Sequence, residues 1–379
     1  YAKGFSNEND SMTEQELEKA LRTAAEADVA VIFAGLPEIF ESEGYDRTSM
    51  KLPKCQDRLI EEVLKVQPNV VVVLHNGSPV ELPWADRVSA ILEMYLGGQG
   101  VGEACDRLLF GEANPSGRLS ETFPYRLEDN PSFLHFPGNG KRVLYGEDIF
   151  VGYRYYDTKK VPVRYAFGHG LSYTEFTYGD LTLSSAQMTD EDILTVSLKV
   201  KNSGKTEGKE VVQLYVADLC GISERPVKEL KGFAKVHLLP GEEKTVSMEI
   251  SARNLSYYEE RLGDWYAPSG TYRILIGHAS DDIRLHADVV FETKKKLPLR
   301  VDFTTTFGEL LDHTKTAPVI TELLAPLAAA AASAEGMSDE YKKLGEQVIR
   351  EMPLKSLLGQ MPGEQVEQLI GQLNCLLAQ

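Results

Sequence analysis

Seven consecutive residues near the start of the chain, Glu41 to Arg47 (ESEGYDR), carry the side chains best suited to chemistry. They follow an apolar run with the composition of a buried strand, and the loops after parallel strands are where α/β sheets expose reactive groups. A crowded acidic loop can keep one carboxyl group protonated near neutral pH, and cleavage of a glycosidic bond needs such a proton donor beside a second carboxylate. The same residues also fit a solvated turn with a surface ion pair, so spacing alone leaves both interpretations open.

The segment around this loop alternates between helical and strand patterns, from residue 13 to about residue 110. Thr13 and Glu16 form a capping box ahead of an apolar stripe, which predicts a helix that feeds a strand at 29–34. Further patterns predict strands at 70–74 and 90–96 and helices around 59–64 and 104–110. Because the strand runs are continuous rather than alternating, we expect parallel strands that are covered on both faces.

The later part of the chain changes its period twice. Leu194, Val196, Leu198 and Val200 alternate with polar residues, and similar runs continue to about residue 291, which predicts a β-sandwich. Helical stripes then follow, one of Tyr341, Leu344 and Val348 and another of Val366, Leu369, Ile370, Leu373 and Leu377. We expect these stripes to be buried on the rest of the protein, with a contact between copies in a homo-oligomer as the alternative.

These patterns predict α/β plus all-β architecture in four segments. We expect an α/β sandwich domain at 1–125, an irregular connecting segment at 126–178, a β-sandwich at 179–293 and a helical extension at 294–379. Because the connecting segment is long, we expect it to have a role of its own.

Composition excludes several classes of partner. The chain has 40 basic and 57 acidic residues among 379, a net charge of −17, which disfavours nucleic acid and anionic membrane surfaces. Its four cysteines show no CxxC spacing, so we expect neither a metal site nor a disulfide framework, and cytoplasmic location is favoured, with secretion left open. The alanine-rich stretch 323–334 is too short to span a bilayer.

Three other motifs have a structural and a functional interpretation. The glycine-rich run 97–102 lacks the dinucleotide fingerprint, because Glu103 stands where the last glycine would be, so we expect no cofactor. His75 follows the second strand and either contacts a sugar hydroxyl or only stabilises the turn. The aromatic run 145–157 either stacks on sugar rings or docks the connection onto the domains.

An ordered series of motifs resembles the carboxyl-terminal part of family 3 glycoside hydrolases, especially bacterial and yeast β-glucosidases. The series is ESEGYDR at 41–47 with MKLP at 50–53, NGSP at 76–79, YLGG at 95–98, LFG at 109–111, NPSG at 114–117 and YAFGHGLSY at 165–173. The run RPVKELKGF at 225–233 is similar to the fibronectin type III-like module of those enzymes. The resemblance covers about residues 24–291, and the tail from Thr304 resembles an extension of some bacterial members.

The resemblance implies a retaining mechanism with the general acid/base on Glu43, and Glu41 remains the alternative. We expect Asp46 and Arg47 to pair with each other and support the loop, and Tyr45 and His75 to contact substrate. The aspartate nucleophile would come from an amino-terminal TIM barrel that this chain lacks, so we expect the chain to be inactive alone.

The implied partners are carbohydrates, chiefly β-glucosides and oligosaccharides, together with the barrel domain in cis or in trans. β-Xylosidase or another exo-glycosidase of the same family is an alternative, because the residues that distinguish sugars lie mostly on the barrel. A non-catalytic carbohydrate-binding or scaffolding module is the rival from another functional class.

Overall fold

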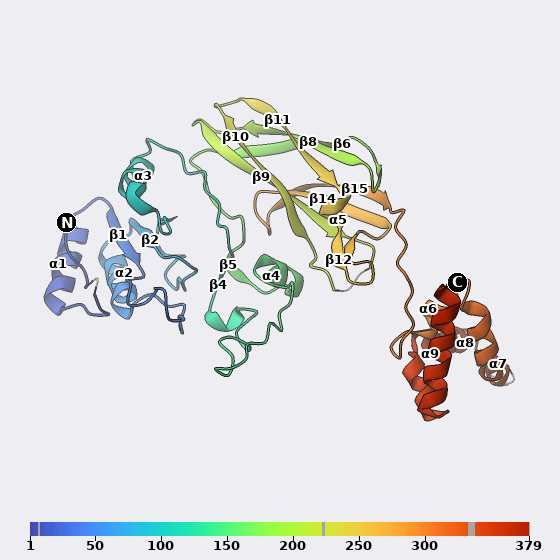
Figure 1. Ribbon diagram of the computed structural model, residues 1–379. Coiled ribbons are helices and arrows are strands. Elements are labelled where there is room, and N and C mark those ends of the chain that lie inside the picture. Colours follow the sequence, from blue (N-terminus) through green and yellow to red (C-terminus); the bar gives the residue numbers. More distant parts are fainter. Residues whose placement is uncertain (7, 222–223, 333–337, 379) are drawn as a thin grey trace. The chain divides into compact units, whose positions relative to one another are not determined.

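The computed structural model describes residues 1–6, 8–221, 224–332 and 338–378. It divides into two compact units (Figure 1), one of Tyr1–Tyr257 with Ala267–Lys294 and one of Tyr258–Tyr266 with Lys295–Gln379. The boundaries predicted from the sequence stay predictions, although the short hairpin Tyr258–Tyr266 groups with the helical tail.

The first unit begins with helices and a parallel sheet of order β1-β2-β3. The elements are α1 (Glu14–Ala25), β1 (Ala30–Gly35), α2 (Lys54–Val66), β2 (Val70–His75), β3 (Ala90–Glu93), the 3-10 turn η1 (Gly98–Gly100) and α3 (Val101–Leu109). The capping box of Thr13 and Glu16 is present, so that prediction is confirmed. Both strand pairs are parallel, with Ala34 beside Leu74 and Leu74 beside Glu93 in the register.

The two faces of β1 differ in their cover. Ile32 and Ala34 are buried with residues of α1 and α2 in one hydrophobic cluster. On the other face of β1, Val31 and Phe33 are 41% and 53% exposed. The expectation of cover on both faces is therefore wrong for β1 in the described residues, because an apolar run shows that a strand can be buried but not that a covering layer is present.

The connecting segment has more regular structure than its sequence indicated. It contains the 3-10 turn η2 (Leu127–Asp129) and helix α4 (Tyr153–Lys159), and β5 (Val163–Tyr165) pairs antiparallel with β4 (Phe123–Pro124). The segment thus leaves the α/β domain and returns to it. Leu119 and Gly168 close the excursion, since Leu119 N–H donates to His169 O and Gly168 N–H donates to Leu119 O, both at 2.8 Å.

A β-sandwich completes the first unit (Figure 1), with sheets of order β10-β9-β14-β15-β7 and β11-β8-β6. The strands are β6 (Phe176–Leu183), β7 (Gln187–Thr189), β8 (Ile193–Asn202), β9 (Gly208–Asp218), β10 (Glu229–Leu238), β11 (Glu243–Ser251), β14 (Gly270–Gly277) and β15 (Ile283–Glu292), with helix α5 (Ala252–Leu255) after β11. The alternating residues of β8 are all buried in the core between the sheets, as their period predicted.

The second unit contains the helices of the tail and the hairpin of β12 (Tyr257–Glu259) and β13 (Asp264–Tyr266), except for Tyr257. These helices are α6 (Phe307–Asp312), α7 (Ala317–Ala332), α8 (Asp339–Glu351), the 3-10 turn η3 (Leu354–Gly359) and α9 (Gly363–Ala378). The α9 stripe packs into the core of the unit, with Val366 and Leu373 fully buried. The predicted burial of the α8 stripe is wrong, because Tyr341, Leu344 and Val348 are 66%, 56% and 53% exposed.

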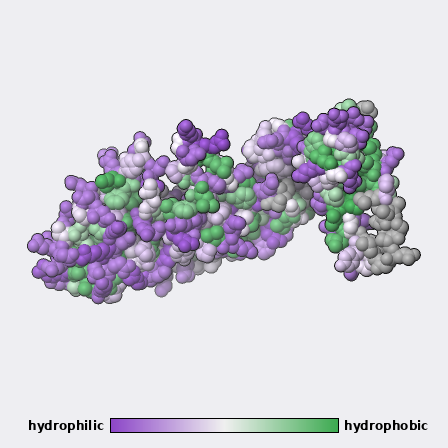
Figure 2. Space-filling view, turned by 90° about the horizontal axis from the view of Figure 1, so that it is seen from below, coloured by the Kyte–Doolittle hydropathy of each residue, from purple (hydrophilic) through white to green (hydrophobic). Residues whose placement is uncertain are grey.

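Hydrophilic residues cover most of the face seen in Figure 2, with smaller apolar patches among them. None of the helices in the described part of the chain has the length and apolar character needed to cross a membrane.

Candidate active site

The acidic loop starts where β1 ends, at Gly35. A Cβ at this position would lie 2.0 Å from the carbonyl oxygen of His75, so only glycine fits between the two strands. The buried side chain of Gln56 on α2 bonds both backbone groups of Gly35, accepting from its N–H and donating to its carbonyl oxygen, each at 2.9 Å. Helix α2 therefore fixes the point at which the chain leaves the sheet.

Glu41 is clamped against the loop that follows β2. Its Oε2 accepts from the Gly77 N–H at 2.5 Å, and its Oε1 accepts from the Ser78 hydroxyl at 2.6 Å. Arg47 Nη1 donates to Ser78 Oγ at 2.5 Å and lies 3.4 Å from Glu41 Oε1 and from the Pro79 carbonyl oxygen. The side chains of Glu41 and Arg47 are only 20% and 17% exposed, and their hydrogen bonds hold the loop against the residues that follow β2.

The predicted pair of Asp46 and Arg47 is wrong. Arg47 points inward and pairs with Glu41, because the β2 loop offers it a hydroxyl and a carbonyl oxygen as additional acceptors. Asp46 is exposed, and its carboxylate has no ion-pair partner among the described residues.

Glu43 stands apart from this clamp. It is exposed, and the described residues place no hydrogen-bond or ion-pair partner on its carboxylate. Tyr45 is anchored by its hydroxyl, which donates to the Glu38 carbonyl oxygen at 2.5 Å, and the residue is 49% exposed. Within the described residues, the loop thus presents two unengaged carboxylates, Glu43 and Asp46, on either side of the anchored ring of Tyr45.

His75, the other residue that we expected to contact substrate, lies at the end of β2. Its ring stacks on Phe33 with 6.4 Å between centroids and 13° between planes, and the residue is half-buried. The structure places it at the same sheet edge as the acidic loop, but its contact with a sugar stays a prediction.

Glu93, which lies in none of the sequence motifs, connects β3 to the β2 loop. Asn76 is fully buried, and its Nδ2 donates to the Ser78 carbonyl oxygen at 3.0 Å and to Glu93 Oε2 at 3.2 Å. The Tyr95 N–H donates to Glu93 Oε1 at 2.8 Å. An acidic residue at the end of an otherwise apolar strand was the available signal for Glu93.

The electrostatics around Glu93 favour its neutral form. Burial raises its pKa to about 7, and the nearby charges of Glu121 and Glu41 act in the same direction. The hydrogen bonds from Tyr95 and Asn76 oppose this shift only in part. Glu93 is therefore a carboxyl group that titrates near neutral pH.

Two cavities of about 370 Å³ each lie in the first unit. One is beside the acidic loop and is lined in part by Arg47, Ser78, Glu121 and Tyr156. Its lining therefore includes residues of both the acidic loop and the connecting segment.

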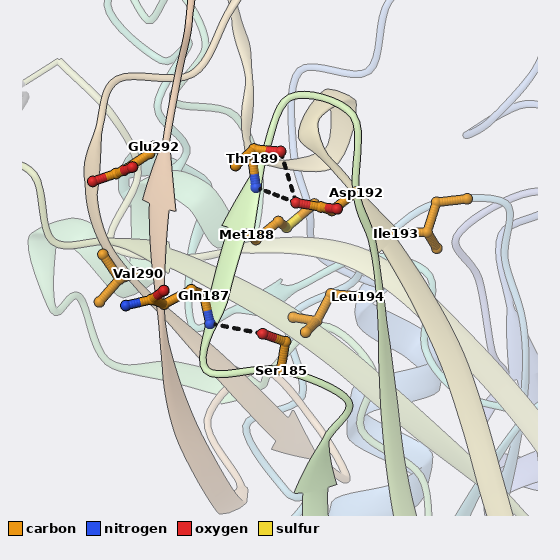
Figure 3. Close-up of a pocket in the computed structure, with 9 residues that line it drawn as sticks. All are labelled: Ser185, Gln187, Met188, Thr189, Asp192, Ile193, Leu194, Val290 and Glu292. Carbon is orange, nitrogen blue, oxygen red and sulfur yellow. Dashed lines mark hydrogen bonds between the residues drawn. The ribbon is translucent and has the colours of Figure 1, made fainter.

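The other cavity is in the β-sandwich, where Figure 3 shows Asp192 and Ser185 bonded within their own turn and the side chains of Gln187 and Glu292 without a bond among the residues drawn. Asp192 accepts from the N–H and hydroxyl of Thr189, and Ser185 accepts from the Gln187 N–H. Among the described residues, no group of three or more His, Cys, Asp or Glu side chains could hold a metal ion.

Comparison with known families matches two parts of the chain. Residues 2–173 match the glycosyl hydrolase family 3 C-terminal domain, and residues 210–280 match the fibronectin type III-like domain. The chain belongs to the C-terminal part of glycosyl hydrolase family 3. The family resemblance inferred from the motifs is thereby confirmed.

Similar proteins of known sequence are β-glucosidases. The chain is 47% identical to thermostable β-glucosidase B of Acetivibrio thermocellus over 99% of its own length and 50% of that protein. It is 46% identical to a β-glucosidase of Kluyveromyces marxianus over 71% of its length and 32% of that protein. The chain therefore spans half or less of the length of these relatives.

Solved structures give the same result. The family 3 β-glucosidase of Bifidobacterium adolescentis matches with a TM-score of 0.77 and 38% identity over 84% of this chain and 47% of that one. The Kluyveromyces marxianus β-glucosidase in complex with glucose matches with a TM-score of 0.70 and 44% identity over 74% of this chain and 33% of that one.

Proposed function

We propose that this chain supplies the proton donor of a retaining β-glucosidase and that Glu43 is the donor. The observation that carries the assignment is the contrast between two neighbouring carboxylates. Glu41 is held by Gly77 and Ser78, whereas Glu43 is exposed two residues further along the same loop. A proton donor must reach the substrate, and a carboxylate already engaged by donors of its own domain is poorly placed to do so. Glu41 is accordingly a support of the loop rather than the acid.

In the proposed reaction, an aspartate of a TIM barrel outside these residues attacks the anomeric carbon. Glu43 protonates the departing glycosidic oxygen, so the aglycone leaves as an alcohol and a glycosyl–aspartate ester forms. Glu43, now a carboxylate, takes a proton from water, which attacks the anomeric carbon and releases the sugar and the aspartate. Both steps need Glu43 at a fixed distance from the sugar, and we expect the hydrogen bonds of Glu41 to hold the loop that carries it.

The proposed substrates are terminal β-D-glucosyl residues of small glucosides and oligosaccharides. The support is that the similar proteins named above are β-glucosidases and that one was solved with glucose. Tyr45 and His75 are the proposed sugar contacts on this side of the site. A β-xylosidase or another exo-glycosidase of the family remains the alternative, and cytoplasmic location stays a prediction.

The test uses the longer polypeptide that contains both the barrel and this chain. Glu43→Gln should reduce turnover of glucosides with poor leaving groups by about 10²-fold or more, with a much smaller loss for activated aryl glucosides, because only poor leaving groups need protonation. Glu41→Gln is the matched control and should reduce both classes similarly, since it disturbs loop position. If the leaving-group dependence followed Glu41→Gln instead, the donor would be Glu41.

Assays on the 379-residue chain alone distinguish the proposed enzyme from a non-catalytic binding module. We expect it to hydrolyse no aryl β-glucoside and to show no tight binding of glucose, xylose or cellobiose in calorimetric titration. Tight binding by the chain alone would favour a non-catalytic carbohydrate-binding module.

A further inference from the structure

A continuous set of hydrogen bonds joins the loops that follow the three strands of the parallel sheet. Glu41, after β1, bonds the backbone of Gly77 and the hydroxyl of Ser78, after β2. Asn76, also after β2, bonds the carbonyl oxygen of Ser78 and the carboxyl group of Glu93 at the end of β3. The position of the acidic loop therefore depends on a residue two strands away.

Asn76 links the two halves of this hydrogen-bond network. It is fully buried, its Nδ2 donates to both neighbours, and its Oδ1 has no hydrogen-bond partner among the described residues. A buried amide oxygen without a partner costs free energy, so the amide keeps this orientation only while an acceptor attracts Nδ2. An ionised Glu93 is such an acceptor. A protonated Glu93 can instead donate to Oδ1 if the amide flips, and Nδ2 then turns away from Ser78.

We propose that Glu93 is a positioning residue. Its charge determines the orientation of the Asn76 amide and thereby the position of the β2 loop that bonds Glu41. Its consequence for catalysis rests on the proposed function, whereas the positioning itself rests on the hydrogen bonds alone. Glu93 does not touch the reacting atoms in this scheme. It acts on Glu43 through the loop that Glu41 anchors.

The titratable groups that interact electrostatically with Glu93 are Glu41, Glu121 and Tyr95. Glu41 and its partner Arg47 belong to the β1 loop, Glu121 precedes β4, and Tyr95 follows β3. Because burial raises the pKa of Glu93 to about 7, it is neutral below this pH and charged above it. The clamp should accordingly be tighter above pH about 7 and looser below it.

The first experiment needs no catalysis and uses the 379-residue chain. The amide resonance of Gly77, which bonds Glu41, is followed by NMR as a function of pH. We expect a titration step near pH 7 in the wild type, at the same midpoint as the carboxyl carbon of Glu93. Glu93→Gln should abolish that step, whereas the exposed control Glu103→Gln should leave it unchanged.

Two outcomes would overturn the proposal. One is a step near pH 7 that persists in Glu93→Gln. The other is a wild-type Gly77 amide resonance whose titration midpoint differs from that of the Glu93 carboxyl carbon. This second measurement uses the wild type only, so it remains valid if the variant fails to fold.

The second experiment measures catalysis in the longer polypeptide. Glu93→Gln should reduce kcat by about 10-fold to 100-fold for poor and activated leaving groups alike, as expected when the donor is displaced rather than removed. It should also change the pH profile near neutrality. A selective loss for poor leaving groups would contradict a positioning role. If the Gly77 step is present but no glucoside is hydrolysed, the proposed function fails and the positioning role stands.

Discussion

Replacing Glu210 with alanine should destabilise the β-sandwich strongly. Glu210 is fully buried on β9, and its carboxylate accepts from Arg118 Nη2 at 2.7 Å and from the Tyr178 hydroxyl at 2.6 Å. His278 Nδ1 lies 2.7 Å away, and its Nε2 lies 2.8 Å from the Gly170 carbonyl oxygen. Both ring nitrogens of His278 are therefore within hydrogen-bond distance of oxygen atoms, one of Glu210 and one of Gly170.

The magnitude follows from what the substitution leaves behind. The Arg118 side chain is 7% exposed, so without Glu210 its charge remains buried and uncompensated. Breaking a buried ion pair in this way costs about 3–5 kcal/mol. Since about 1 kcal/mol shifts the Tm of a small domain by several degrees, the sandwich should melt at least about 10 °C lower.

Scanning calorimetry of the 379-residue chain measures this shift. The matched control is Asp288→Ala, which removes an acid that pairs with Arg273 on the surface, with both side chains 39–43% exposed. That pair should contribute no more than about 1 kcal/mol. Equal shifts for Glu210→Ala and Asp288→Ala would refute the argument that burial makes the difference.

Two further predictions concern the α/β domain. Ser78→Ala removes the hydroxyl that bonds both Glu41 and Arg47. The substitution should destabilise the acidic loop by about 1–3 kcal/mol and speed the hydrogen exchange of its backbone amides. Unchanged exchange would show that these bonds do not hold the loop. Burial raises the pKa of Asp57 to about 6, so the folded state binds this proton more tightly than the unfolded state does. The free energy of unfolding should therefore fall as pH rises from about 4 to about 6. Asp57→Asn, which can still accept from Trp84 Nε1, should reduce this fall in urea unfolding; an identical fall would assign it to other groups.

Local sequence signals predicted the features that depend on neighbours in the chain. The capping box at Thr13 and the alternating apolar residues of β8 are visible in the sequence because their partners are a few residues away or on one face of one strand. The motif series identified the family, and with it the acidic loop. Strands of two or three residues, such as β4 and β5, are too short to show a period, so the connecting segment looked irregular.

The failures concern partners that are distant in sequence. Asp46 adjoins Arg47, yet the guanidinium pairs with Glu41 and with the β2 loop, which only the folded sheet brings within reach. The α8 stripe is apolar, as its spacing indicated, but the sequence does not show whether another surface covers it. Glu93 was missed for the same reason, since its role depends on Asn76 in the neighbouring loop.

The closed excursion between Leu119 and Gly168 also has a consequence for how much this protein can vary. The two ends are fixed to each other by backbone bonds, and Gln213 of the sandwich donates to the Gly168 carbonyl oxygen at 3.1 Å. Between these ends, Leu134 and Tyr145 are 87% and 80% exposed. Residues 137–144 are exposed and do not line the cavity beside the acidic loop, so insertions and deletions there would change neither end of the segment, and this short stretch is the natural place for variation in length and for engineered tags.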